Sequence, residues 1–198
     1  MTFVLSSFND SYRGVPPWDI GRPQREFVKL AESGEVRGEL IDVGCGTGEH
    51  AIYFASRGHK VLGVDSAPLA IEKARLKAAE RGSSAEFKVC DALHMDALDR
   101  KFHTAIDSGL FHIFPDRERR AYVRSLAEAV VPGGKFFMLC FSDMEPVDWG
   151  GPRRISRGEI EGSFSAGWRV DFVRQATFES TFHQDGGKAW LSSVTRLR

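Results

Sequence analysis

The chain has 198 residues, and its 27 lysines and arginines balance 27 aspartates and glutamates, so its formal net charge is zero. This length is typical of one domain, and the balanced charge argues against nucleic acid or an anionic membrane surface as a partner. No apolar run reaches the ~18–20 residues of a membrane span, and no signal peptide is recognisable at the N-terminus. The cysteines, Cys45, Cys90 and Cys140, form no CxxC pair, so we expect a cytoplasmic protein without a disulfide framework or zinc site.

Short apolar runs alternate with longer amphipathic stretches, as is typical of βα units on a mostly parallel sheet. The expected strands are 40–43, 60–64, 86–90, 102–107, 135–141, 168–178 and 188–196. The expected helices are 49–56, 67–81 with Ser66 as N-cap, and one between 116 and 130. A hairpin turn is expected at Asp185-Gly186-Gly187. The pattern predicts an α/β fold with a doubly wound, mostly parallel sheet of seven strands.

The first 38 residues do not belong to this alternation. Residues 8–22 are rich in aromatic residues and proline, and residues 23–32 have a helical pattern. We expect a single domain over 1–198, in which 1–38 form a lid and a helix and 39–198 form the sheet. The N-terminal part is too short for a second substrate domain.

A glycine-rich loop, Asp42-Val-Gly44-Cys-Gly46-Thr-Gly48, lies between the first predicted strand and a helix. Glycines let the backbone turn tightly and approach a ligand, and the helix N-terminus offers free N–H groups. The dinucleotide fingerprint would place its third glycine at position 49, which is Glu49. An NAD-dependent oxidoreductase is therefore the less favoured alternative, and a plain tight turn is another.

Acidic residues follow the next two strands. Asp65 can accept both hydroxyls of a ribose, and Asp91 can accept from an adenine amino group, with the Ala92 N–H beside it. Asp65 as part of a helix cap and Asp91 as a surface turn residue are the simpler interpretations. Asp42 lies inside an apolar strand, where an unpaired carboxylate is costly, so a ligand ammonium or a backbone N–H is expected beside it.

The glycine spacing and the succession Asp42, Asp65 and Asp91 resemble the motifs of the class I S-adenosylmethionine-dependent methyltransferases. Asp107-Ser108-Gly109 and residues 126–134 resemble the later motifs of that family. The resemblance implies a Rossmann-like methyltransferase fold with S-adenosyl-L-methionine as the cofactor. The cofactor-binding residues it implies in the sheet are Asp42, Gly44, Cys45 (through its backbone), Gly46, Gly48, Asp65, Ser66, Asp91, Ala92, Asp107 and Ser108.

The N-terminal motif Pro17-Trp18-Asp19-Ile20-Gly21-Arg22 resembles that of the thiopurine and thiol/halide methyltransferase group. In that group this segment folds over the cofactor, which would place Tyr12 and Trp18 near the sulfonium, where aromatic faces attract a cation. A packed N-terminal arm with a buried Trp18 is the alternative.

The acceptor is expected at the carboxyl ends of the strands, between residues 108–114 and 142–152. The apolar and aromatic residues of these loops favour a small, flat acceptor, although Phe111 and Phe114 are equally compatible with the core. These loop residues are Phe111, His112, Phe114, Met144, Trp149 and Pro152. A thiol or phenol must lose a proton, so His112 is the candidate base, with Tyr12 as a second catalytic candidate. The histidines show no metal-ligand spacing, so no metal is expected.

The sequence thus predicts methyl transfer from S-adenosylmethionine to a small-molecule acceptor, a thiol or a phenol/quinol. The alternatives are the oxidoreductase, a nucleic-acid-modifying methyltransferase and a non-catalytic cofactor-binding module. The nucleic-acid alternative is disfavoured because residues 107–110 lack the Pro-Pro-aromatic motif of adenine methylation. No oligomeric state is predicted.

Overall fold

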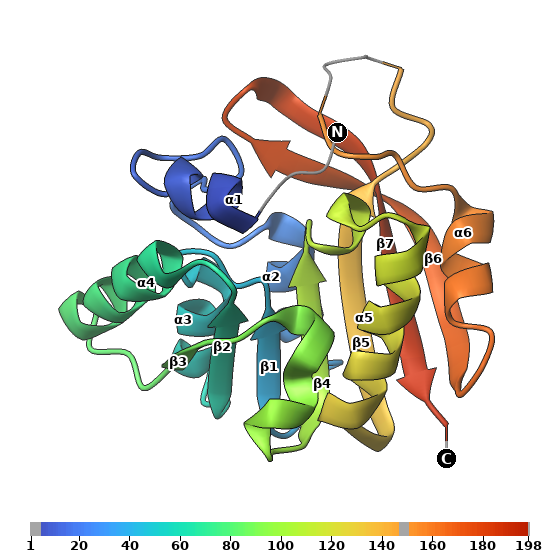
Figure 1. The fold of residues 1–198 in the computed structure, drawn as a ribbon, viewed down its shortest axis with the longest axis horizontal. Helices are drawn as coiled ribbons and strands as arrows, with labels where there is room; N and C mark the ends of the chain where they lie inside the picture. The colour runs from blue at the N-terminus through green and yellow to red at the C-terminus, as the bar shows by residue number, and fades with distance from the viewer. Residues whose placement is uncertain (1–4, 147–150, 198) are drawn as a thin grey trace.

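The computed structural model describes residues 5–146 and 151–197, and its centre is one seven-stranded sheet (Figure 1). The strands occur in the order β3-β2-β1-β4-β5-β7-β6. β1 to β5 are parallel, and β7 runs antiparallel to both β5 and β6. The strands are β1 (Leu40–Val43), β2 (Val61–Asp65), β3 (Glu86–Val89), β4 (Phe102–Ser108), β5 (Val130–Phe141), β6 (Trp168–Ser180) and β7 (His183–Arg196). The predicted fold class is confirmed.

Helices cover both faces of the sheet because its central strands are apolar on both sides. Leu40 and Phe137 belong to one buried cluster with α2, α3 and α4, whereas Ile41 and Phe136 belong to another with η1, α5 and α6. Such strands read as continuous apolar runs. Figure 1 shows α5 and α6 in front of the sheet, and α1 beside α4. The helices are α1 (Leu5–Ser11), α2 (Arg25–Glu32), α3 (Glu49–Ser56), α4 (Pro68–Glu80), η1 (Ala92–Leu98), η2 (Phe111–Ile113), α5 (Asp116–Ala129) and α6 (Arg157–Ser163).

Three local expectations were wrong. The hairpin turn lies at residues 181–182 rather than at Asp185-Gly186-Gly187, because β7 begins at His183 and Gly186 lies within it. The N-cap of α4 is Ala67, not Ser66, and the Asp65 side chain accepts from the Ala67 N–H. β5 begins at Val130, so it already includes the Pro-Gly-Gly sequence that was expected to precede it.

The β6–β7 hairpin extends beyond the rest of the sheet. β5 and β7 pair as far as Phe141 and Ala189, but β6 and β7 continue to pair as far as Ser180 and His183. At about 3.3 Å per residue the hairpin reaches roughly 15 Å past the carboxyl edge. We call residues 177–187 the flap; it leans over the carboxyl edge of the sheet toward α1 (Figure 1). No helix among the described residues is long and apolar enough to cross a membrane.

Candidate active site

The glycine loop lies at the carboxyl end of β1, next to the switch in strand order between β1 and β4. Gly44, Gly46 and Gly48 have φ values of 72°, 53° and 85°, which L side chains rarely adopt. A Cβ on Gly48 would lie 2.7 Å from the Phe87 ring, so glycine is needed there for close packing as well. The loop therefore presents bare backbone at the N-terminus of α3, as an anionic or polar ligand requires.

Asp65 joins the loops after β1 and β2. Its Oδ2 accepts from the Gly46 N–H and its Oδ1 from the Ala67 N–H, each at 2.9 Å. Burial raises the pKa of this carboxyl, and the backbone hydrogen bonds oppose that effect. Backbone N–H groups of Gly46, Ser66 and Ala67 thus hold this carboxylate between the ends of β1 and β2.

Two further carboxyls are buried on neighbouring strands. Asp42 is 1% exposed; burial raises its pKa to about 8, and its Oδ2 has no hydrogen-bond partner among the described residues. Asp107 accepts from the Leu110 N–H at 2.7 Å, the Phe111 N–H at 3.0 Å and the Tyr122 hydroxyl at 2.9 Å. Burial also raises its pKa, to about 7. The Ala51 N–H donates to the Asp42 carboxyl, and the unpartnered Oδ2 suits a ligand that carries an ammonium group.

The N-terminal segment lies directly against the glycine loop. Tyr12 is buried, and a Cβ on Gly46 would lie 2.9 Å from its hydroxyl oxygen. That hydroxyl accepts from Trp18 Nε1 at 3.1 Å, and the two rings meet edge to face with centroids 6.2 Å apart. Burial, and secondarily Asp65, raise the pKa of Tyr12. Trp18 remains 39% exposed, so the packed arm with a buried Trp18 does not form.

Hydrogen bonds hold the lid segment against the glycine loop on one side and against the flap on the other. Thr47 in the glycine loop donates from Oγ1 to Asp19 at 2.8 Å. On the other side, the Gln24 amide donates to the Glu179 carbonyl and accepts from the Glu179 N–H, both at 2.8 Å. The Glu179 carboxylate pairs with Arg22 at 2.8 Å. Sequence analysis did not identify Gln24 or Glu179, because no local pattern joins residues 155 positions apart.

The remaining residues of the expected cofactor set lie around the same edge. Asp91 is the N-cap of η1, and its side chain accepts from the Leu93 N–H at 2.9 Å. Ala92 is buried beside it, and Ser108 ends β4. Burial raises the pKa of the Cys45 thiol well above its usual value, which agrees with a role for its backbone alone.

His112 lies in η2, after β4, in an aromatic stack. Its ring lies parallel to that of Phe141, with an interplanar angle of 10° and centroids 5.1 Å apart, and its centroid lies 5.8 Å from that of Phe178. Nδ1 accepts from the Phe141 N–H at 3.1 Å, so the proton of the neutral ring is on Nε2. Burial lowers the pKa of His112 to about 3. The arrangement is that of a hydrogen-bond donor and does not suit the general base expected from the sequence.

Other expected acceptor residues have different surroundings. Phe111 stacks on Phe164, and Phe114 packs on Tyr122, so both belong to the core beneath α5. Met144 is 45% exposed and Pro152 is half-buried. Trp149 lies outside the described residues. Phe178, which the sequence did not single out, completes the aromatic stack.

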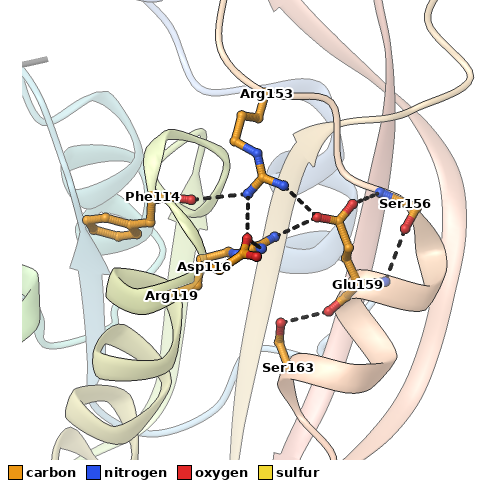
Figure 2. A network of polar contacts seen from close by, with 7 residues as sticks. All are labelled: Phe114, Asp116, Arg119, Arg153, Ser156, Glu159 and Ser163. Atoms are coloured by element: carbon orange, nitrogen blue, oxygen red, sulfur yellow. Dashed lines mark hydrogen bonds and ion pairs between the residues drawn. The ribbon is translucent and has the colours of Figure 1, made fainter. Parts of the chain in front are cut away.

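A network of ion pairs joins Arg153 and the helix α6 to the start of α5 (Figure 2). Glu159 accepts from Arg119 at 2.8 Å, from Arg153 at 2.7 Å and from the Ser156 N–H at 2.9 Å. Arg119 and Arg153 also contact Asp116. Burial opposes ionisation, but these hydrogen bonds outweigh it and lower the pKa of Glu159 to about 2. The network therefore ties α6 to the start of α5, next to η2 and His112.

Comparisons with known proteins agree with this geometry. Residues 40–134 match the methyltransferase domain family. The chain is 40% identical over 192 residues to a 2-heptyl-1-hydroxyquinolin-4(1H)-one methyltransferase of Mycobacteroides abscessus, covering 91% of this chain and 85% of that protein. It is 28% identical to a probable thiol methyltransferase 2 of Arabidopsis thaliana, over 75% of this chain and 66% of that one. A solved structure described as "Conversion of a Disulfide Bond into a Thioacetal Group during Echinomycin Biosynthesis" superposes with a TM-score of 0.88 and 33% identity, covering 98% and 93% of the two chains.

The chain belongs to the class I S-adenosylmethionine-dependent methyltransferases. It is an enzyme that takes its methyl group from S-adenosylmethionine and acts on a small molecule. The predicted class and cofactor are thus confirmed, and the resemblance to thiol methyltransferases holds at low identity. Among the described residues no three His, Cys, Asp or Glu side chains are placed to hold a metal ion.

Proposed function

We propose that this enzyme methylates a ring-bound hydroxyl of a flat heteroaromatic molecule of the hydroxyquinolinone class. The Mycobacteroides abscessus relative, which matches 91% of the chain, is named for such an acceptor. The observation that carries the proposal is the His112 stack. It combines a flat aromatic wall with one N–H donor, and no described residue hydrogen-bonds to that Nε2.

The neutral His112 suits an acceptor that needs no protein base. A histidine with a pKa of about 3 whose Nδ1 already accepts a hydrogen bond cannot take a proton near neutral pH. An acceptor hydroxyl acidic enough to ionise in water arrives as an anion, and the Nε2–H can hold and orient its oxygen. Phe141 and Phe178 would exclude water from the reacting oxygen.

The residues around the glycine loop fit the cofactor. When bound, S-adenosylmethionine supplies an activated methyl group on a positively charged sulfur. We propose that Asp65 accepts from the ribose hydroxyls, and that Asp42 faces the cationic amino group. Tyr12 and Trp18 lie against the glycine loop, and we propose that their rings cover the sulfonium and exclude water, which assigns Tyr12 to cofactor positioning.

A sulfur acceptor is the second candidate. It is supported by the 0.88 TM-score to the structure from echinomycin biosynthesis and by the thiol methyltransferase relatives. A thiolate is also an anion that a neutral N–H donor can hold, so the site geometry is compatible with both acceptors.

The test is methyl transfer from isotope-labelled S-adenosylmethionine, followed by mass spectrometry of the product. The acceptors are 2-heptyl-1-hydroxyquinolin-4-one, its analogue without the hydroxyl, a simple phenol and an aromatic thiol. We expect label on the hydroxyl oxygen of the first compound and none on the analogue. Preferred labelling of the thiol would establish the second candidate, and labelling of neither would reject the proposal. The Gly46→Ala variant serves as the cofactor-binding control.

A further inference from the structure

Three half-exposed apolar side chains lie on segments near the carboxyl edge of the sheet. They are Trp18 in the lid, Met144 after β5 and Phe182 at the tip of the flap, with exposed fractions of 39%, 45% and 50%. Single exposed apolar residues are ordinary on a protein surface, but a group of them on adjoining segments is a usual sign of a ligand or partner.

Hydrogen bonds and a close side-chain contact bring these segments together. The Thr181 N–H donates to the Pro17 carbonyl at 2.9 Å, and these two residues directly precede Phe182 and Trp18. On the other side of the tip, His183 Nε2 lies 3.9 Å from Glu145, which follows Met144. The flap tip therefore lies between the lid and the segment that follows β5.

The flap also joins this outer rim to the buried aromatic stack. Phe178, four residues before Phe182, has its ring centroid 4.7 Å from that of Phe141, and it packs on His112. A Cβ on Gly109 would lie 2.9 Å from the Phe178 ring, so the base of the flap is closely packed. The flap thus runs from Phe178, beside the proposed site of the acceptor oxygen, out to the exposed Phe182.

We propose that this rim, formed by Trp18, Met144 and Phe182, binds an aliphatic tail on the acceptor, whose ring lies at His112. The inference rests on the proposed function, because it requires the acceptor ring to lie against Phe141 and Phe178. A tail of several methylene groups reaches from that ring along the flap to Phe182. Its burial against apolar side chains provides affinity that a methyl substituent lacks.

The test compares 1-hydroxyquinolin-4-ones that carry a methyl, butyl or heptyl group at position 2. We expect KM to fall by at least tenfold from methyl to heptyl, with kcat changing little, because the tail binds equally before and during methyl transfer. Phe182→Ala and Met144→Ala should each raise KM for the heptyl compound about three- to tenfold and leave the methyl compound unchanged. Leu76→Ala removes a side chain of similar exposure from α4 and should change neither.

Binding of 2-heptylquinolin-4-one, which lacks the hydroxyl, separates this inference from the proposed function. Its calorimetric affinity should fall in Phe182→Ala and stay constant in Leu76→Ala. Such binding without methyl transfer to any hydroxyquinolinone would support the rim and reject the proposed function. Methyl transfer with the same KM for all three chain lengths would overturn the rim and support the proposed function. Failure of every alkylated compound to bind would reject both.

Discussion

The backbone N–H of Phe141 donates to Nδ1 of His112 over 3.1 Å while the two rings stack. This bond fixes the proton on Nε2 and presents the ring as a donor. As a methyl group reaches an acceptor anion, the oxygen loses its charge, so the donor stabilises the bound anion more than the transition state. We therefore expect His112→Phe to raise KM for the hydroxyquinolinone about tenfold or more, with a smaller effect on kcat.

His112→Gln is the matched variant, since its amide can accept from Phe141 and still donate toward the acceptor. Its KM for the hydroxyquinolinone should lie closer to that of the unmodified enzyme than to that of His112→Phe. The pH profile of kcat/KM should follow the acceptor hydroxyl, with no histidine inflection between about pH 5 and 8, because burial lowers the pKa of His112 to about 3. An inflection in that range which disappears in His112→Gln would show that His112 is a base after all.

Asp42 should make the stability of the cofactor-free enzyme depend on pH. Its folded pKa of about 8 lies above the ordinary value of 3.8, so between these values the folded state holds a proton that the unfolded chain has lost. The free energy of unfolding should therefore fall as pH rises from about 4 to 8. Asp42→Asn should flatten this part of the curve in urea titrations, leaving the contribution of Asp107, whose pKa is raised in the same direction.

Cofactor binding should release part of this proton, because an ammonium group beside Asp42 favours the ionised carboxyl. Calorimetry with S-adenosylhomocysteine at pH 7 in buffers of different ionisation enthalpy measures the release directly. We expect less release in Asp42→Asn. Identical proton release in the two proteins would place the amino group elsewhere.

Gly46→Ala should abolish cofactor binding without unfolding the chain. Its φ of 53° disfavours any side chain, and the new methyl group would lie 2.9 Å from the Tyr12 hydroxyl oxygen at the cofactor loop. Gly58→Ala is the control, since its φ of 89° imposes similar strain but nothing lies within 4 Å of the added methyl group. Both variants should lose about 1 kcal/mol of stability, and only Gly46→Ala should lose S-adenosylhomocysteine affinity. Equal affinities would contradict the assignment of this loop.

The alternation of apolar runs was enough to predict the sheet because parallel strands buried on both faces have a distinctive composition. The positions of the glycine loop, Asp42 and Asp65 were equally predictable, since each lies in or directly after a short apolar strand. Their roles toward the cofactor stay predictions. The hairpin was placed too late because the Asp-Gly-Gly sequence is a typical turn signal, yet Gly186 is accommodated within β7 beside Thr177. The contact between Glu179 and the lid could not be predicted, because it joins residues far apart in the sequence. The same holds for the hydrogen bond from the Phe141 N–H to Nδ1 of His112.

Glu179→Gln should loosen the lid. The carboxylate accepts from Arg22 and from the Arg25 N–H at 3.0 Å, and Arg22 holds the pKa of Glu179 below its usual value. An amide cannot pair with Arg22 as a charge, so the lid should open more often and S-adenosylhomocysteine should dissociate several-fold faster in stopped-flow experiments. Glu32→Gln, at the exposed end of α2, should leave the rate unchanged. Equal dissociation rates would mean that the lid does not limit release.

The network around Glu159 should stabilise the contact between α5 and α6 (Figure 2). Glu159→Gln removes a charge that accepts from Arg119 and Arg153, and leaves Arg119, whose side chain is only 8% exposed, with a weaker partner. We expect a loss of about 1–2 kcal/mol in the free energy of unfolding at neutral pH. Glu161→Gln in the same helix breaks only an exposed pair with Arg157 and should cost less than about 0.5 kcal/mol.

Because the folded pKa of Glu159 is about 2 against an ordinary 4.5, its contribution to stability is complete above about pH 4.5. It is lost as pH falls toward 2, so the two variants should converge in acid. A difference between them that persists unchanged at pH 2 would show that Glu159 acts through packing and not through its charge.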